Sequence, residues 1–293
     1  MNDTAGGLDA LLPGDMARKA EQVGVNKVGA SPVSTFVLAV LAGAFISLGA
    51  VFATVATSGD LDPGLSRVLG GLTFCLGLVL VIGAGAELFT GNALIMMAAA
   101  SRKVTLTALL RNWGIVYAGN VAGALATAML VVWSGHHELG AGAVGDTAMS
   151  IANAKVEMTW LEALLRGILA NALVCLAVWL SFAARTLTDR IMAVLFPITA
   201  FVAAGFEHSI ANLYFLPAAL FLKSDSDLSY WDTTTAGPED HPAITWSGFI
   251  TDNLIPVTIG NMIGGGVLVA LVYWFVYLGP RSPGDPGRRE RAS

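Results

Sequence analysis

Two short polar stretches interrupt long apolar runs, and each carries side chains that can bind an anion or move a proton. The first reads Glu87-Leu88-Phe89-Thr90-Gly91-Asn92, and the second reads Gly205-Phe206-Glu207-His208-Ser209. A carboxylate that faces lipid costs roughly 2.5 kcal/mol or more. Interrupted spans at corresponding places in two halves of a chain indicate a transporter binding site at the bilayer midplane. The pattern therefore favours a transport protein.

His208 is the strongest candidate for chemistry, because an imidazole can bind an anion and exchange a proton with it near neutral pH. A lone histidine in an apolar segment is more often a satisfied core residue, but this one lies beside Glu207 in an interruption that exposes backbone groups. Thr90 lies in the matching interruption, and an inverted pseudo-two-fold axis would bring the two interruptions together. We therefore expect Thr90 and His208 to converge on one small-anion site.

The other polar residues of these segments fit a structural role. A carboxylate on an anion path would repel the anion, whereas it can accept bonds from the N–H groups of an unwound segment and hold the loop in shape. We therefore predict that Glu87 and Glu207 support the broken helices. Asn120 and Asn261 each lie in a G-N-x-x-G motif, and we expect them to bond backbone groups that the breaks leave free. The glycines of these motifs favour close helix packing; they are Gly119, Gly123, Gly260 and Gly264.

The composition places the chain in a membrane. Of its 293 residues 55% are hydrophobic and 13% are charged, and the mean hydropathy is +0.68. A soluble domain carries about 25% charged residues, so most of this surface must face lipid. The net charge of -5 indicates no nucleic-acid partner. Cys75 and Cys175 lie within apolar runs and are expected to be small buried hydrophobes; no metal site, cofactor or cleavable signal is predicted.

Apolar stretches long enough to cross a bilayer occur six times. They lie at about residues 34–57, 67–100, 106–134, 158–184, 190–222 and 248–279. The second and fifth are too long for one plain helix, so each should form two half-helices around its interruption. Because each half holds three spans, the halves must be inverted in the membrane. We predict an all-α membrane protein of six spans in two inverted three-span repeats, with spans two and five broken.

The distribution of Lys and Arg predicts that both termini are cytoplasmic. The inner set would be Arg18, Lys19, Lys27, Arg102, Lys103, Arg111, Arg185, Arg190, Arg281, Arg288, Arg289 and Arg291, and the outer set Arg67, Lys155 and Lys223. Arg166 remains within the fourth span. Residues 1–32 are expected to form a cytoplasmic segment with a short amphipathic helix, residues 33–279 the pore domain, and residues 280–293 a disordered tail. The apolar stripe of the helix would be Leu11, Leu12, Met16 and Val23.

These motifs resemble those of the formate/nitrite transporter family over nearly the full length of the chain. The segments that carry the resemblance are Gly85-Ala86-Glu87-Leu88-Phe89-Thr90-Gly91, Gly167-Ile168-Leu169-Ala170-Asn171-Ala172-Leu173-Val174-Cys175-Leu176-Ala177, and Gly205-Phe206-Glu207-His208-Ser209-Ile210-Ala211-Asn212. Ala172 stands where the family usually has a larger apolar residue, a change that affects packing beside Asn171. Leu11-Leu12-Pro13 and the segment at 250–261 are most similar to the formate channels of the family.

The resemblance implies an aquaporin-like protomer with its own pore, a homopentamer, and the cytoplasmic (inner) membrane of a bacterium. It also implies that His208 and Thr90 form the central site, with Asn171 and Lys155 nearby. Phe74, Leu78 and Phe201 would make the periplasmic constriction, and Leu88, Phe89 and Val174 the cytoplasmic one. The N-terminal segment of formate channels is linked to gating and to the cytoplasmic formate-producing lyase, so residues 1–32 are expected to play that part.

Formate is mostly ionised at neutral pH, and a bare anion in a dry constriction loses several kcal/mol of hydration. A proton passed from His208 would convert it into formic acid, which crosses an apolar slit more easily. Acidic exterior conditions would then favour import, and a proton-free route would suit efflux. Nitrite, hydrosulfide and acetate remain alternative anions. A membrane enzyme or receptor would need a nucleophile–base pair, a nucleotide loop or a soluble domain, and a neutral-solute channel would show paired Asn-Pro-Ala segments; neither pattern is found in the sequence.

Overall fold

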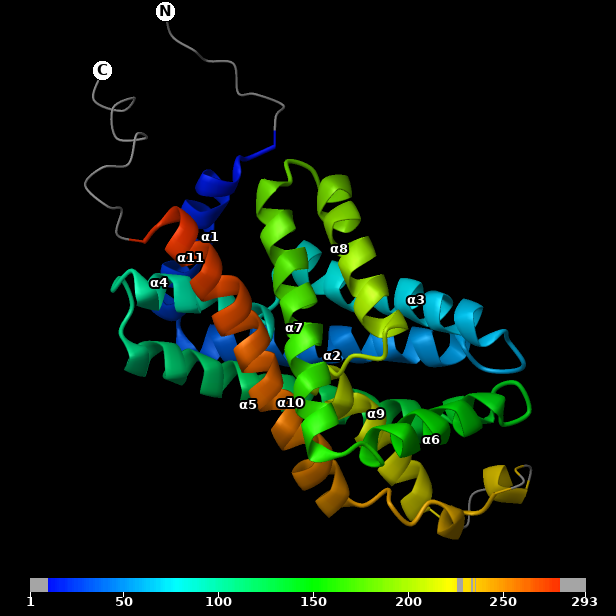
Figure 1. Ribbon diagram of the computed structural model, residues 1–293. Coiled ribbons are helices and arrows are strands. Elements are labelled where there is room, and N and C mark those ends of the chain that lie inside the picture. Colours follow the sequence, from blue (N-terminus) through cyan, green and yellow to red (C-terminus); the bar gives the residue numbers. More distant parts are fainter. Residues whose placement is uncertain (1–9, 226–228, 233, 235, 280–293) are drawn as a thin grey trace, which may run out of the picture.

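The structure is a computed structural model that describes residues 10–225, 229–232, 234 and 236–279. All its regular elements in these ranges are helices (Figure 1). From the N-terminus they are α1 (Pro13–Gly29), α2 (Pro32–Ala56), α3 (Pro63–Ala84), η1 (Gly91–Ile95), α4 (Met96–Ala100), α5 (Leu106–Trp133), η2 (His136–Glu138), α6 (Ala143–Val156), α7 (Trp160–Ala183), α8 (Leu187–Ala203), α9 (Ser209–Ser224), η3 (Ser229–Asp232), η4 (Pro238–Asp240), η5 (Gly248–Leu254), α10 (Ile255–Met262), η6 (Ile263–Leu271) and α11 (Val272–Tyr277).

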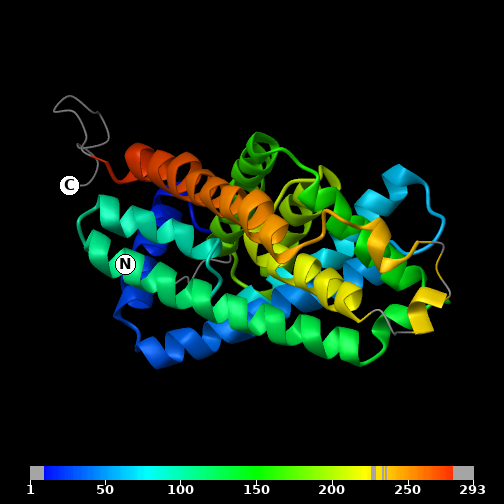
Figure 2. The same ribbon diagram turned by 90° about the horizontal axis from the view of Figure 1, so that it is seen from below.

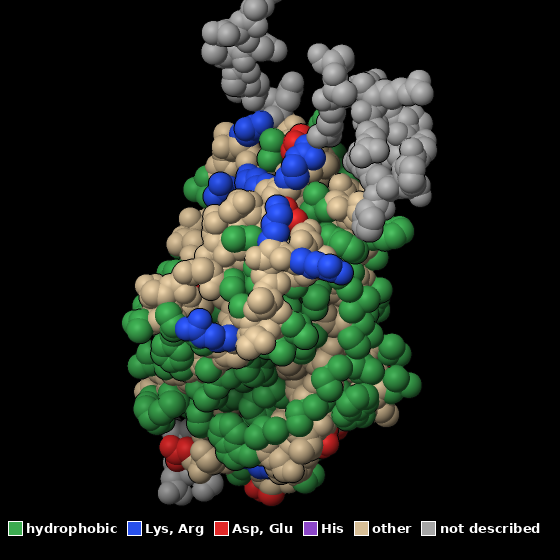
Figure 3. All heavy atoms as spheres, turned by 90° about the vertical axis from the view of Figure 1, so that its left-hand side faces the viewer, with side chains coloured by type: hydrophobic (Ala, Val, Ile, Leu, Met, Phe, Trp, Pro, Cys, Tyr) green, Lys and Arg blue, Asp and Glu red, His purple; other side chains and the backbone are tan. Residues whose placement is uncertain are grey.

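The long helices cross a membrane by length and composition. Within the described residues, α2, α3, α5, α7 and the continuous helix Gly248–Tyr277 each have the length and hydropathy of a span. The fifth span is divided between α8 and α9, as its length in the sequence predicts. In Figure 3 hydrophobic side chains form a wide band, Lys and Arg side chains gather toward the end that holds α1, and acidic side chains lie at the far end. This surface is that of an all-helical membrane protein.

Spans two and five are broken at glycines. Helix α3 is followed by Gly85, which has φ +75°, and α8 is followed after one residue by Gly205, which has φ +70°. Both values lie in the left-handed region that favours glycine, so each helix stops and the chain turns away from its axis. The chain resumes a helix at η1 in the first case and at α9 in the second. These two breaks are where the sequence places them.

Close glycine contacts hold the helices of each repeat together. A Cβ atom added to Gly119 or Gly123 of α5 would lie 2.8 Å or 1.9 Å from a backbone carbonyl of α2. A Cβ atom added to Gly260 or Gly264 would lie 2.3 Å or 2.1 Å from a backbone carbonyl of α7. Only glycine permits backbones to approach this closely. The packing role predicted for these four glycines is confirmed.

Two features of the structure differ from the sequence prediction. The connection before the fourth span contains a helix, α6, which the sequence places in a loop. The sixth span is regular only in part, because η5 and η6 are stretches of π-helix, whose wider turns occur mostly as insertions near functional sites. The four-residue spacing of Gly260 and Gly264 predicts helix but does not distinguish these wider turns.

Helix α1 lies against the end of the bundle that also holds α11 (Figures 1 and 2). It contacts η1, α4 and α7, and its Met16 is 4% exposed. Lys103 forms an ion pair with Glu21 of this helix, and the Lys19 ammonium donates to the carbonyl of Phe182 at 2.8 Å. Leu12 is 71% exposed, so this member of the predicted apolar stripe does not pack.

Candidate functional site

The two breaks meet through a single hydrogen bond. The hydroxyl oxygen of Thr90 lies 2.8 Å from Nε2 of His208, although 118 positions separate the two residues in the chain. Thr90 is fully buried and His208 is 3% exposed. The convergence that the sequence predicts is therefore present in the structure, between the end of the first break and the start of α9.

The position of the imidazole proton follows from its neighbours. The backbone N–H of Ala211 donates to Nδ1 of His208 at 3.1 Å, as expected for a residue at the N-terminus of a helix. A neutral ring that accepts at Nδ1 carries its hydrogen at Nε2. His208 therefore donates to the Thr90 hydroxyl oxygen, and the hydroxyl hydrogen of Thr90 is left to bind another acceptor. An imidazole N–H and a hydroxyl side by side can bind a small anion.

Helix α7 fixes the backbone of Thr90. The side-chain amide of Asn171 donates to the Thr90 carbonyl at 3.2 Å and to the Asn261 carbonyl at 2.6 Å. The Cys175 thiol donates to the same Thr90 carbonyl at 3.3 Å. The Asn171 amide thus donates both hydrogen bonds to backbone carbonyls, and it links the first break to the sixth span.

Asn120 holds the first break in place. Its side-chain oxygen accepts the N–H of Phe89 at 2.9 Å. Its amide donates to the carbonyl of Ala39 at 2.7 Å and to that of Glu87 at 2.9 Å. The Phe89 N–H and the Glu87 carbonyl lie in the break and have no helical partner there, and a buried group without a partner is costly. The Ala39 carbonyl lies in α2, so Asn120 also ties the break to that helix.

Asn261 repeats the arrangement in the second half. Its side-chain oxygen accepts the N–H of Ser209 at 2.9 Å, and its amide donates to the carbonyls of Gly167 at 2.8 Å and Glu207 at 3.0 Å. Both asparagines are fully buried. Bracing of the broken backbone is the use expected for them from the sequence.

The carboxylate of the first break bonds side chains. Glu87 accepts from the ammonium of Lys27 at 2.8 Å and from the amide of Asn92 at 2.7 Å. Asn92 also donates to Asn112 at 3.0 Å, and Asn112 donates to the carbonyl of Lys27 at 3.4 Å. The N-terminal helix is thereby tied to the break.

The second break has the same set of partners. Glu207 accepts from Lys155 at 2.8 Å, from Asn212 at 2.7 Å and from Asn253 at 3.3 Å. Asn212 donates to Asn253 at 2.6 Å, and Asn253 donates to the carbonyl of Lys155 at 3.0 Å. Lys155, at the end of α6, is therefore the repeat mate of Lys27 at the end of α1, and its ammonium is occupied by a carboxylate.

Sequence reasoning missed the supporting asparagines and Lys27, although a signal for them exists. In each half an acid precedes an asparagine by five residues, as Glu87 precedes Asn92. In each half two asparagines also lie eight residues apart on the third span of that half, as Asn112 and Asn120 do. The bonds of both carboxylates run to side chains, not to the backbone N–H groups that the sequence suggests.

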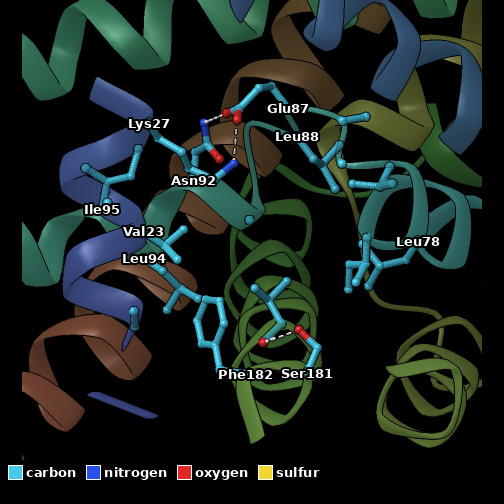
Figure 4. Close-up of a pocket in the computed structure, with 18 of the residues that line it drawn as sticks. Val23, Lys27, Leu78, Glu87, Leu88, Asn92, Leu94, Ile95, Ser181 and Phe182 are labelled. Carbon is cyan, nitrogen blue, oxygen red and sulfur yellow. Dashed lines mark hydrogen bonds and ion pairs between the residues drawn. The ribbon is translucent and has the colours of Figure 1, made fainter. Parts of the chain in front are cut away.

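A cavity opens on each side of the Thr90–His208 contact. The cavity beside α1, the α1 vestibule, has a volume of about 350 Å³, and its wall includes Lys19, Lys27, Glu87, Leu88 and Arg190. Figure 4 shows Lys27 and Asn92 turned toward Glu87, with Val23 on their side of the space and Leu78 on the opposite side.

The cavity beside α6, the α6 vestibule, also has a volume of about 350 Å³. Its wall includes the cations Arg67, Lys155 and Arg166, the single carboxylate Glu207, and His208. An excess of cations over carboxylates in both vestibules attracts anions.

Several of the apolar side chains predicted to form constrictions lie on the vestibule walls. Phe74 and Phe201 line the α6 vestibule and make an edge-on ring contact with centroids 5.7 Å apart, and the Phe201 ring lies 6.0 Å from that of His208. Leu78 lies on the wall of the α1 vestibule together with Leu88, and both are 2% exposed. Leu78 therefore lies with Leu88 on the α1 side, and not with Phe74 and Phe201 on the α6 side.

The two other predicted constriction residues lie deeper. The Phe89 ring packs against Tyr117 at a centroid distance of 4.9 Å and against Trp113 at 6.0 Å. Val174 is 2% exposed, on the turn of α7 that follows Asn171. Neither side chain is part of a vestibule wall.

Comparison with known proteins places this geometry among transporters. The model of the formate/nitrite transporter family matches residues 14–275. The formate channel FocA of Escherichia coli strain K12 is 45% identical over 272 residues, which cover 92% of this chain and 95% of that protein.

Two solved structures are also similar. One is described as a pentameric formate channel with formate bound; it has a TM-score of 0.80 and 42% identity, over 84% of this chain and 98% of the other. The second, an ion channel of the same family, has a TM-score of 0.77 and 28% identity, over 89% of this chain and 98% of the other.

Proposed function

The chain belongs to the formate/nitrite transporter family, and we propose that it is a pentameric membrane channel for formate in which His208 gives permeation its pH dependence. The observation that carries this proposal is the 2.8 Å contact between the Thr90 hydroxyl and Nε2 of His208. This contact lies between the two cationic vestibules, next to the Phe74–Phe201 pair of the α6 vestibule.

In this mechanism formate takes the place of the Thr90–His208 bond. The Nε2–H of His208 and the hydroxyl of Thr90 each donate to the anion, which compensates for part of the hydration lost in the constriction. When the ring takes a second proton, that proton must go to Nδ1, and His208 then gives up the N–H of Ala211. The imidazolium passes the Nε2 proton to a formate oxygen, and neutral formic acid moves on while the proton at Nδ1 keeps the ring neutral until the ring tautomer is restored.

The orientation and the partners belong to the same proposal. The cationic end that holds α1 is cytoplasmic under the positive-inside rule, so the α6 vestibule opens to the periplasm of a bacterial inner membrane. Residues 1–32 regulate flux at the α1 vestibule, and the formate-producing lyase is the partner proposed for this segment. Lys155 acts at the central site by holding Glu207 beside His208.

Reconstituted vesicles test the function. Uptake of formate, nitrite, hydrosulfide and chloride is recorded across imposed pH steps for the wild type and for His208→Phe. We expect formate uptake that rises on acidification in the wild type and loses this pH response in His208→Phe. Unchanged pH dependence in that variant would refute the role of His208, and faster nitrite or hydrosulfide uptake would move the chain to that branch of the family.

A further inference from the structure

The two repeats differ in charge at a position that bonds the breaks. Leu38 of α2 and Arg166 of α7 are repeat mates, because the Leu38 carbonyl accepts the N–H of Glu87 at 3.2 Å and the Arg166 carbonyl accepts the N–H of Glu207 at 3.3 Å. The first half therefore has a leucine where the second has a guanidinium. A cation within a membrane helix is costly unless it faces water or a charged partner, so its presence marks a functional site.

Arg166 lies next to the second break and lines the α6 vestibule. A Cβ atom added to Gly205 would lie 4.0 Å from its Nη1, and Arg166 is part of the vestibule wall. Its side chain is half-buried. Arg67, at the start of α3, is exposed and lines the same cavity. Two arginines from different repeats thus open onto one space of about 350 Å³.

Neither arginine forms an ion pair with an acidic side chain among the described residues. Within the described part of the chain, no ion pair or side-chain hydrogen bond engages Arg67 or Arg166. The acid one turn before Arg166 is Glu162, and its carboxylate already accepts from the N–H and hydroxyl of Thr159 at 2.9 Å and 2.8 Å. The third cation of the vestibule, Lys155, is paired with Glu207. Glu162, which is exposed, attracts Arg166 by charge without bonding it, so both guanidinium groups keep their N–H donors for a ligand.

We propose that Arg166 and Arg67 form a binding subsite for small planar carboxylates in the α6 vestibule, which the anion occupies before it reaches Thr90 and His208. The inference rests on the proposed formate channel and adds a second site to it. A guanidinium donates two parallel N–H groups that match the two oxygens of a carboxylate. A spherical halide gains the charge attraction without the paired hydrogen bonds. The subsite therefore favours formate over chloride at the mouth of the pore, whereas a bare cationic surface would not.

The subsite is tested by measuring formate entry separately from each side of the membrane. Formate flux is measured with the full-length protein in right-side-out and in inverted membrane vesicles, so that entry is read separately from the α6 side and from the α1 side. We expect Arg166→Gln to raise the half-saturating formate concentration about 5-fold for entry from the α6 side only. Arg166→Lys, which keeps the charge and loses the fork, should recover part of the affinity. The half-saturating chloride concentration, measured as inhibition, should shift less than that of formate.

The matched control is Arg190→Gln. Arg190 lines the α1 vestibule, so this variant should raise half-saturation for entry from the α1 side only. Arg67→Gln is the second variant, since a change at an exposed residue near the start of α3 leaves folding intact. Unaltered half-saturation for formate in folded pentamers of Arg166→Gln and Arg67→Gln would overturn the subsite, as would an equal shift for chloride. Failure of the channel proposal itself is seen separately, as the absence of saturable formate flux in the wild type.

Discussion

Replacing Glu207 by glutamine should destabilise the protein more than the same change at its repeat mate, Glu87. Glu207 accepts three side-chain donors, from Lys155, Asn212 and Asn253. A glutamine has one side-chain oxygen and one NH2 group in place of two acceptor oxygens. The NH2 group must face one of these donors, so at least one buried donor loses its acceptor.

The structure sets the expected size of each loss. The side chains of Lys155 and Glu207 are 13% and 4% exposed, and those of Lys27 and Glu87 are 26% and 13% exposed. Breaking a buried pair from one side costs about 3 kcal/mol or more. We expect about 3 kcal/mol for Glu207→Gln and about 1.5 kcal/mol for Glu87→Gln, because water reaches the Lys27 pair more readily. Formate transport should persist in both variants, since the geometry of Thr90 and His208 is kept.

The assay is unfolding in mixed detergent micelles at fixed protein concentration, followed by far-UV circular dichroism. A double variant, Lys155→Met with Glu207→Gln, removes the unpaired ammonium and should recover about 2 kcal/mol relative to the sum of the single changes. Equal losses for Glu87→Gln and Glu207→Gln, or additive losses in the double variant, would refute the assignment of a buried charge pair. Loss of transport in a well-folded pentamer of Glu207→Gln would show that its charge acts in permeation.

Three further outcomes follow from the packing and charge of other regions. Gly123→Ala should disrupt the packing of α5 on α2, because its Cβ would lie 1.9 Å from the Val40 carbonyl. Gly114→Ala in the same helix has no neighbour within 4 Å, so this variant should fold normally; size-exclusion chromatography compares the two. Burial lowers the pKa of His137 in η2, so below about pH 6.5 the unfolded state binds more protons than the folded state, and the free energy of unfolding falls on acidification. His137→Gln should reduce the difference in stability between thermal melts at about pH 7.5 and at about pH 5.5. Deleting residues 1–28 removes Lys27 from Glu87 and should alter the rate or pH response of formate flux in intact pentamers; failure to assemble would make α1 part of the fold.

Local chemistry made much of the site predictable. Glycine next to polar residues inside apolar runs requires a broken helix, which is why both breaks and the approach of Thr90 to His208 follow from the sequence. The G-N-x-x-G motifs likewise specify helices in close contact. Each of these inferences depends on residues within one turn of one another, or on the symmetry between two similar segments.

Long-range partners were not predictable in the same way. Lys155 was expected to lie in an outer loop and near the central site. In the structure it lies in a helix rich in small residues, α6, which brings its ammonium to the Glu207 carboxylate. Leu78 was expected in one constriction with Phe74 and Phe201, but Phe74 lines the α6 vestibule and Leu78, one helical turn further along the same face of α3, lines the α1 vestibule. Which vestibule a residue lines depends on its depth along the helix, and hydropathy does not encode this depth.

The carbonyl of Thr90 has consequences for biosynthesis. The N–H of Ala93, in the first repeat, donates to it at 3.4 Å, and its two side-chain donors, Asn171 and Cys175, both lie on α7. The ribosome synthesises α3, η1, α4 and α5 before α7, so a nascent chain that has delivered only its first three spans to the bilayer holds this carbonyl in a low-dielectric layer without those side-chain donors. By itself the first repeat supplies this carbonyl only with the bond from Ala93. We therefore expect the polar break to reach its final packing when translation supplies the fourth span.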